Sequence, residues 1–129
     1  MPIEMQMLLW SVALTAIQVT VAALGVVTAI GLPSAAGNRQ DVPVYQGWIG
    51  RAQRAHRNML ESLVLFAVLV LIAAVQGKFN ATTALGSEIF FGARVAYAVV
   101  YLIGIPWLRT AIWGVSVVGL VMIFTQLIK

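Results

Sequence analysis

Arginine, asparagine and glutamate side chains recur with helical spacing at residues 51–61, where the chain enters a long apolar stretch. At about 100° per residue, five of them fall within roughly 120° of one helical face: Arg51, Arg54, Arg57, Asn58 and Glu61. Arginines that share a face with an amide favour the binding of an anion. His56 points to the opposite side, and we interpret it as an interfacial residue rather than a ligand or a base.

Glu61 is the carboxylate of this face. It lies roughly 10 Å along the helix axis from Arg54, at about 1.5 Å per residue, which carries it past the lipid headgroups toward hydrocarbon. Ionisable groups inside a membrane usually face a partner or a wet cavity, so Glu61 is a candidate functional residue. The alternative is a structural ion pair with an arginine of a neighbouring helix.

The composition is that of an integral membrane protein. Of 129 residues, 61% are hydrophobic and only 9% are charged. The net charge of +4 arises mainly from residues that flank apolar segments, so nucleic-acid binding is not expected. There is no cysteine, which excludes disulfides, zinc–thiolate sites and a protein thiol nucleophile. No metal site is expected, and any thiol chemistry must use an external thiol.

Four apolar segments predict an all-α fold, a four-helix bundle in one transmembrane domain. The expected spans are residues 7–32, 52–76, 84–104 and 107–128, and residues 33–50 are expected to form an aqueous loop rich in turn formers. The first span carries a stripe of small or weakly polar residues: Ser11, Thr15, Gln18, Ala22 and Gly25. We interpret this stripe as a helix-packing surface in preference to a ligand-binding role for Gln18.

The third span repeats the polar character of residues 51–61. Arg94, Tyr97 and Tyr101 share one helical face, although packing or interfacial anchoring would equally explain the tyrosines. Proline suits a first helical turn, so Pro106 places Arg109 and Thr110 near the N-terminus of the fourth helix. Because successive helices alternate in direction, these residues converge with Asn58 and Glu61 in one leaflet, with Arg94 deeper. The convergence predicts an anion-binding site.

Basic residues near the span ends predict the orientation. One side carries Arg39, Arg51, Arg54, Arg57 and Arg109, and the other carries only Lys78 and Lys129 besides the amino terminus. Cytoplasmic loops are enriched in basic residues, so both termini should lie outside the cytoplasm. Alkaline phosphatase fused after Lys129 should therefore be active, and activity only from a fusion within residues 33–50 would contradict this orientation.

These motifs resemble the signatures of the MAPEG family, the membrane-associated proteins in eicosanoid and glutathione metabolism, in a bacterial-type member. Residues 54–61 are similar to the Arg-x-x-x-Asn-x-x-Glu signature, and residues 93–97 with Tyr101, Arg109 and Thr110 are similar to the helix three to helix four signature. The resemblance implies a homotrimer that binds glutathione between subunits. The ligands it implies are Arg54, Asn58, Glu61, Arg94, Tyr97 and Tyr101, with Arg57 and Thr110, and Arg109 stabilises the glutathione thiolate.

The resemblance implies a glutathione-dependent transferase or peroxidase acting on a lipophilic electrophile or hydroperoxide in a bacterial inner membrane. Arg109 and Tyr101 are then the catalytic pair. Residues 7–32 lack the arginine that several eicosanoid-type members place near the cytoplasmic end of the first helix. A non-catalytic membrane subunit or lipid-binding scaffold of the same fold is the alternative. A small multidrug exporter would need a carboxylate within the first span, and residues 7–32 have none.

Overall fold

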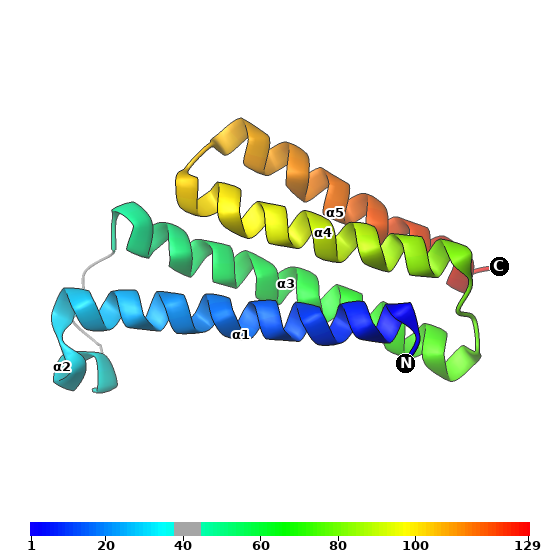
Figure 1. Cartoon of the computed structure of the whole chain (residues 1–129), viewed down its shortest axis with the longest axis horizontal. Helices are drawn as coiled ribbons and strands as arrows, with labels where there is room; N and C mark the ends of the chain where they lie inside the picture. Colours follow the sequence, from blue (N-terminus) through cyan, green and yellow to red (C-terminus); the bar gives the residue numbers. More distant parts are fainter. Residues whose placement is uncertain (38–44) are drawn as a thin grey trace.

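The computed structural model describes residues 1–37 and 45–129, and most of them are helical. The long helices are α1 (Ile3–Ile30), α3 (Gly47–Gln76), α4 (Ala81–Ile103) and α5 (Pro106–Leu127), and α2 (Leu32–Ala36) is a short helix after α1. Figure 1 shows the long helices running alternately in opposite directions, with both termini at one end. All four are long and apolar enough to cross a membrane. The protein is therefore a multi-pass helical membrane protein.

Several helices begin or end at other residues than the sequence predicts, because residues at their ends cap or interrupt the helix. α1 begins at Ile3 rather than residue 7, and it ends at Ile30 because Gly31 adopts a φ of 82°. α4 begins at Ala81 rather than residue 84, because Asn80 and Thr83 form a reciprocal capping box. α3 begins at Gly47 rather than residue 52, so its first turns come from the expected loop. Arg39 lies outside the described residues.

The small-residue stripe of α1 is buried along its whole length, as expected for a helix-packing surface. Its members are Ser11, Thr15, Gln18, Ala22 and Gly25. The hydroxyl of Thr15 donates to the carbonyl of Ser11 at 2.8 Å, which satisfies the buried hydroxyl within the helix. At Gly25 an added Cβ would lie 2.9 Å from the ring of Trp48. The absence of a side chain therefore lets α1 approach the first turn of α3.

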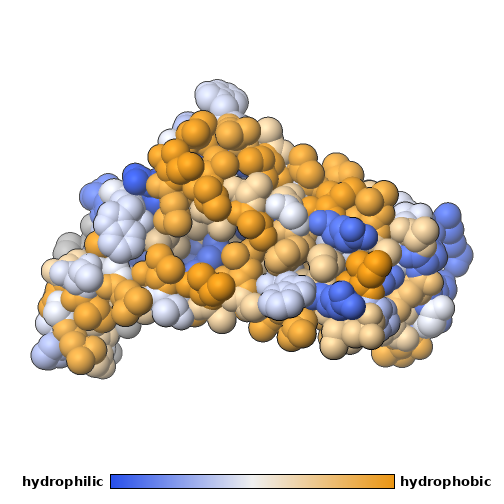
Figure 2. All heavy atoms as spheres, in the orientation of Figure 1, coloured by the Kyte–Doolittle hydropathy of each residue, from blue (hydrophilic) through white to orange (hydrophobic). Residues whose placement is uncertain are grey.

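The hydrophobic core lies between α3, α4 and α5. Phe66 stacks on Phe90 with ring centroids 4.2 Å apart, and the buried residues Met59, Leu120 and Ile123 surround the pair. Many large apolar side chains on the outside of the bundle remain exposed, as befits helices that face lipid. Figure 2 shows this apolar cover over much of one face, with hydrophilic residues at the ends and a few between the apolar ones.

Helices α4 and α5 approach each other closely at a pair of glycines. A Cβ added at Gly119 would lie 2.5 Å from the carbonyl oxygen of Gly86, and one added at Gly86 would lie 2.7 Å from that of Gly119. Both contacts are with backbone, which cannot move without separating the helices. This small-residue contact is typical of membrane helix pairs.

We expect Gly119→Ala to lower the free energy of unfolding by about 1 to 3 kcal/mol, because the new methyl group overpacks the α4–α5 contact. Thermal unfolding of the detergent-purified protein measures the change. Gly92→Ala is the matched control, since an added Cβ there meets nothing within 4 Å. Alanine in an open helical position should be neutral or stabilising by about 0.5 to 1 kcal/mol. Equal stability of the two variants would contradict the close glycine contact.

Candidate functional site

The polar face of α3 divides into a structural part and an open part. Arg51 donates from Nε to the carbonyl of Leu102 at 3.0 Å, where it satisfies a backbone acceptor at the end of α4. Arg54, Arg57 and Glu61 are exposed in the single chain, so they are available to a ligand or a neighbouring subunit. The charged residues of this face therefore have different roles.

Arg94 is the most deeply buried charged side chain in the described part of the chain, at 1% exposure. Its Nη2 donates to Oδ1 of Asn58 at 2.8 Å, and its guanidinium lies over the ring of Tyr97 at 4.2 Å. Its Nε and Nη1 are buried and have no hydrogen-bond partner among the described residues. An arginine remains charged in proteins, and burying a charge with unpaired donors is unfavourable. Binding of an anion to these donors would therefore be favoured.

The two tyrosines of α4 connect Arg94 to the arginine of α5. Tyr97 and Tyr101 are buried, and their rings pack edge to face with centroids 5.5 Å apart. The guanidinium of Arg109 lies 4.6 Å above the Tyr101 ring, and Arg54 donates from Nε to the Tyr101 hydroxyl at 3.3 Å. The tyrosines are therefore packed against each other and in contact with arginines, and their role in binding a ligand stays a prediction.

Two adjoining hollows between α3, α4 and α5 form one open groove. Their volumes are about 160 Å³ and about 260 Å³, and both are lined by Asn58, Tyr97 and Tyr101. We call this the arginine groove and define it by its lining residues: Arg54, Arg57, Asn58, Glu61, Tyr97, Tyr101, Arg109, Thr110 and Trp113. Arg94 contacts it from beneath, through Asn58 and Tyr97.

The groove brings together the site residues expected from the sequence, from three helices, except Arg94, which lies buried beneath it. Thr110 is exposed at its rim and donates its hydroxyl to the carbonyl of Pro106 at 3.1 Å. The structural ion pair considered for Glu61 does not form within residues 1–37 and 45–129, where none of its neighbouring arginines lies within ion-pair distance. Trp113 was not expected, although its spacing of four residues from Arg109 puts both on one helical face.

Other polar residues lie away from the arginine groove. His56 lines a hollow between α1 and α3 with Gln53 and with Arg57, which also lines the arginine groove. The interpretation of His56 as an interfacial residue stays a prediction. Among the described residues, no cluster of histidine, aspartate and glutamate could hold a metal ion. The chemistry available in the groove is thus that of guanidinium, amide, phenol and carboxylate groups.

The groove carries side chains of both charges. Four arginines supply donors for carboxylates, and Glu61 supplies an acceptor for an ammonium group. The fold and this groove define a multi-pass helical membrane protein with a cationic cleft between its spans.

The comparisons with known proteins agree with that class. A model of the MAPEG family matches residues 7–129, nearly the whole chain. The chain therefore belongs to the MAPEG family, the membrane proteins of glutathione and eicosanoid metabolism. Neither the comparison with curated proteins nor that with solved structures gives a match.

Proposed function

We propose that the protein is a glutathione-dependent transferase or peroxidase that acts on a lipophilic electrophile or hydroperoxide. The observation that carries the proposal is Arg94, a buried cation with two unpartnered donors beneath an open groove. A ligand carboxylate that reached this guanidinium would accept a charge-assisted hydrogen bond from one of these donors and neutralise the buried cation. Membership of the MAPEG family makes glutathione the natural candidate.

Each group of glutathione has a complementary residue in the groove. Arg94 and the exposed Arg54 and Arg57 suit its two carboxylates, Glu61 suits its ammonium group, and Asn58 and Tyr97 supply further polar contacts. The thiol would then lie toward α5, where Arg109 and Tyr101 meet. Thr110 lines the same end of the groove and completes the set.

The reaction uses the sulfur of glutathione as the nucleophile. The thiol proton leaves to solvent, and the thiolate is stabilised by Arg109 with the hydroxyl of Tyr101. With an electrophilic carbon, the sulfur lone pair forms a thioether bond and displaces a leaving group or opens a ring. With a hydroperoxide, the sulfur attacks the terminal oxygen and the O–O bond breaks, so the other oxygen leaves as an alkoxide that takes a proton from solvent to give the alcohol. A second glutathione thiol then attacks the sulfenic acid, which gives the disulfide and water. The lipophilic substrate would arrive from the bilayer.

Ultraviolet difference spectroscopy during a glutathione titration tests this function. The detergent-purified protein should develop thiolate absorbance that saturates with glutathione near neutral pH. S-methylglutathione is the control ligand, since it should bind without producing the signal. Binding of glutathione with no thiolate between pH 6 and 8 would instead favour the non-catalytic subunit or lipid-binding scaffold.

We further propose that three chains assemble around such grooves. Arg54, Arg57 and Glu61 are exposed in a single chain that spans the membrane, and a central charge facing lipid costs about 2.5 to 3.5 kcal/mol on insertion scales. A neighbouring subunit would shield these groups and close the open side of the groove. Mass spectrometry of the protein released from detergent should show a trimer, and a predominant monomer or dimer would contradict this assembly.

The orientation expected from the charge asymmetry places the arginine groove in the cytoplasmic leaflet of a bacterial inner membrane. Glutathione is water-soluble, so it would enter from the cytoplasm. The reporter fusion after Lys129 described above tests this placement independently of catalysis.

A further inference from the structure

A second cavity lies between α1, α3 and α4, away from the arginine groove. Its volume is about 200 Å³, and Gln18 is its one polar lining residue among leucine, isoleucine, valine and alanine side chains. It shares no lining residue with the arginine groove. Ala55 forms part of its wall and packs against Tyr97 and Tyr101 on the other side. The two sites are therefore separate.

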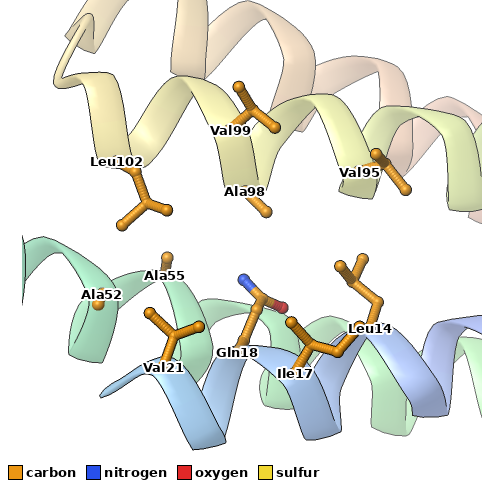
Figure 3. Close-up of a pocket in the computed structure, with 10 residues that line it drawn as sticks. All are labelled: Leu14, Ile17, Gln18, Val21, Ala52, Ala55, Val95, Ala98, Val99 and Leu102. Atoms are coloured by element: carbon orange, nitrogen blue, oxygen red, sulfur yellow. The ribbon is translucent and has the colours of Figure 1, made fainter. Parts of the chain in front are cut away.

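Gln18 lines this cavity with an amide whose buried oxygen lacks a hydrogen-bond partner among the described residues. The side chain is 9% exposed, and its Oε1 is buried and accepts no hydrogen bond from the described part of the chain. Figure 3 shows the amide extending from α1 into the space in front of Ala98 of α4, with apolar side chains on either side. A buried carbonyl without a donor is unfavourable, so a donor from elsewhere would be bound preferentially.

The cavity opens toward the bilayer rather than toward water. Ile17 and Val99 line it and are exposed, at 60% and 55%, on helices that cross the membrane. Gln18 lies about 22 Å from the start of α1 and about 18 Å from its end, at about 1.5 Å per residue. It is thus near the middle of the membrane, far from lipid headgroups. The occupant must be apolar, with one donor placed at that depth.

We propose that this cavity binds a lipid whose aliphatic chain carries a hydroxyl group at a distance from its head. The apolar walls hold the chain, and the hydroxyl donates its proton to Oε1 of Gln18. A hydroxyl can also accept from the Nε2 of the same amide, whereas an unsubstituted chain would leave the amide without a partner. The proposal does not depend on glutathione chemistry, because Gln18 lies outside the arginine groove.

Equilibrium binding of two tritiated methyl esters to the detergent-purified protein tests the proposal. One is the ester of octadecanoic acid, and the other carries an additional hydroxyl in the middle of the chain. Both are neutral, so the arginines should not attract them. The wild-type protein should bind the hydroxylated ester about tenfold more tightly, the range expected for one neutral hydrogen bond that satisfies a buried group.

Gln18→Leu should remove this preference while leaving the plain ester bound as tightly as before. Gln53→Leu is the matched control, because Gln53 lines a different hollow, and it should keep the preference. Ala98→Leu fills the cavity and should weaken both esters by about tenfold or more, which tests the site even where Gln18→Leu does not fold.

Three results would overturn the proposal. They are equal binding of the two esters by the wild-type protein, a preference that survives Gln18→Leu, and no binding of either ester because a neighbouring subunit fills the cavity. Glutathione binding should be unchanged in Gln18→Leu and Ala98→Leu. Failure of the thiolate test would therefore not affect the ester-binding test, and failure of the ester-binding test would not affect the thiolate test.

Discussion

Arg109→Ala is expected to bind glutathione almost as tightly as the wild-type protein and to lose its thiolate absorbance at neutral pH. A free thiol has a pKa of about 8.5, and lowering it by two units requires about 2.7 kcal/mol of preferential thiolate stabilisation. A hydrogen bond to a charged group supplies about 1.5 to 3 kcal/mol. Arg109 can supply most of this requirement, while the carboxylates of glutathione are bound elsewhere in the groove.

The stabilisation that Arg109 can supply barely equals the free energy required to lower the thiol pKa by two units. The first helix contributes no second arginine to the groove, and a helix N-terminus adds only about 0.3 to 1 kcal/mol. Tyr101 lies under the Arg109 guanidinium and is placed to contribute the remainder. Tyr101→Phe should therefore reduce the thiolate signal partially, and Lys78→Ala, far from the groove, should leave it intact. A full thiolate signal in Arg109→Ala would refute the role of this arginine.

Arg94→Leu is expected to weaken glutathione binding by about 100-fold or more, equivalent to about 2.7 kcal/mol, because it removes the buried cation proposed to hold a carboxylate. The same substitution should raise the thermal stability of the ligand-free protein. It removes a buried cation with two unpartnered donors, and the desolvation of that cation costs more than its hydrogen bond to Asn58 returns.

These opposite effects distinguish a binding residue from a structural one. Arg51→Leu is the matched control, since Arg51 donates to the carbonyl of Leu102 and lies outside the groove. It should lower stability and leave glutathione affinity within about twofold, because only a backbone acceptor loses its partner. Isothermal titration and thermal unfolding measure the two properties. A destabilised Arg94→Leu protein with normal affinity would show that Arg94 supports the fold alone.

Periodicity predicted which residues of each helix would lie together, because a regular helix fixes the angle between side chains. The face that carries Arg54 and Glu61 and the buried stripe that carries Gln18 both followed from spacing alone. Spacing also brought Arg94 and Tyr101 to one side of α4. The family resemblance then supplied the roles of these residues, which periodicity could not.

Contacts between helices could not be predicted in the same way, because they depend on how each helix is rotated and how deeply it packs. The hydrogen bond from Arg94 to Asn58, the close approach of Gly86 to Gly119 and the cavity beside Gln18 all arise from this packing. The start of α4 was different, since Asn80 and Thr83 have the spacing of a capping box. That spacing is a signal for the start of α4 that the sequence itself contains.

The hydrogen bond between Thr83 and Glu4 has a consequence for how the protein is made. Thr83 donates to Oε2 of Glu4 at 2.6 Å, and 79 positions separate the two residues along the chain. At about 5 to 20 residues per second, the ribosome needs roughly 4 to 16 s to synthesise the missing partner. During that interval the first helix must keep its carboxyl group in contact with water or with the insertion machinery. The first helix therefore completes its docking only after α4 has been delivered to the membrane.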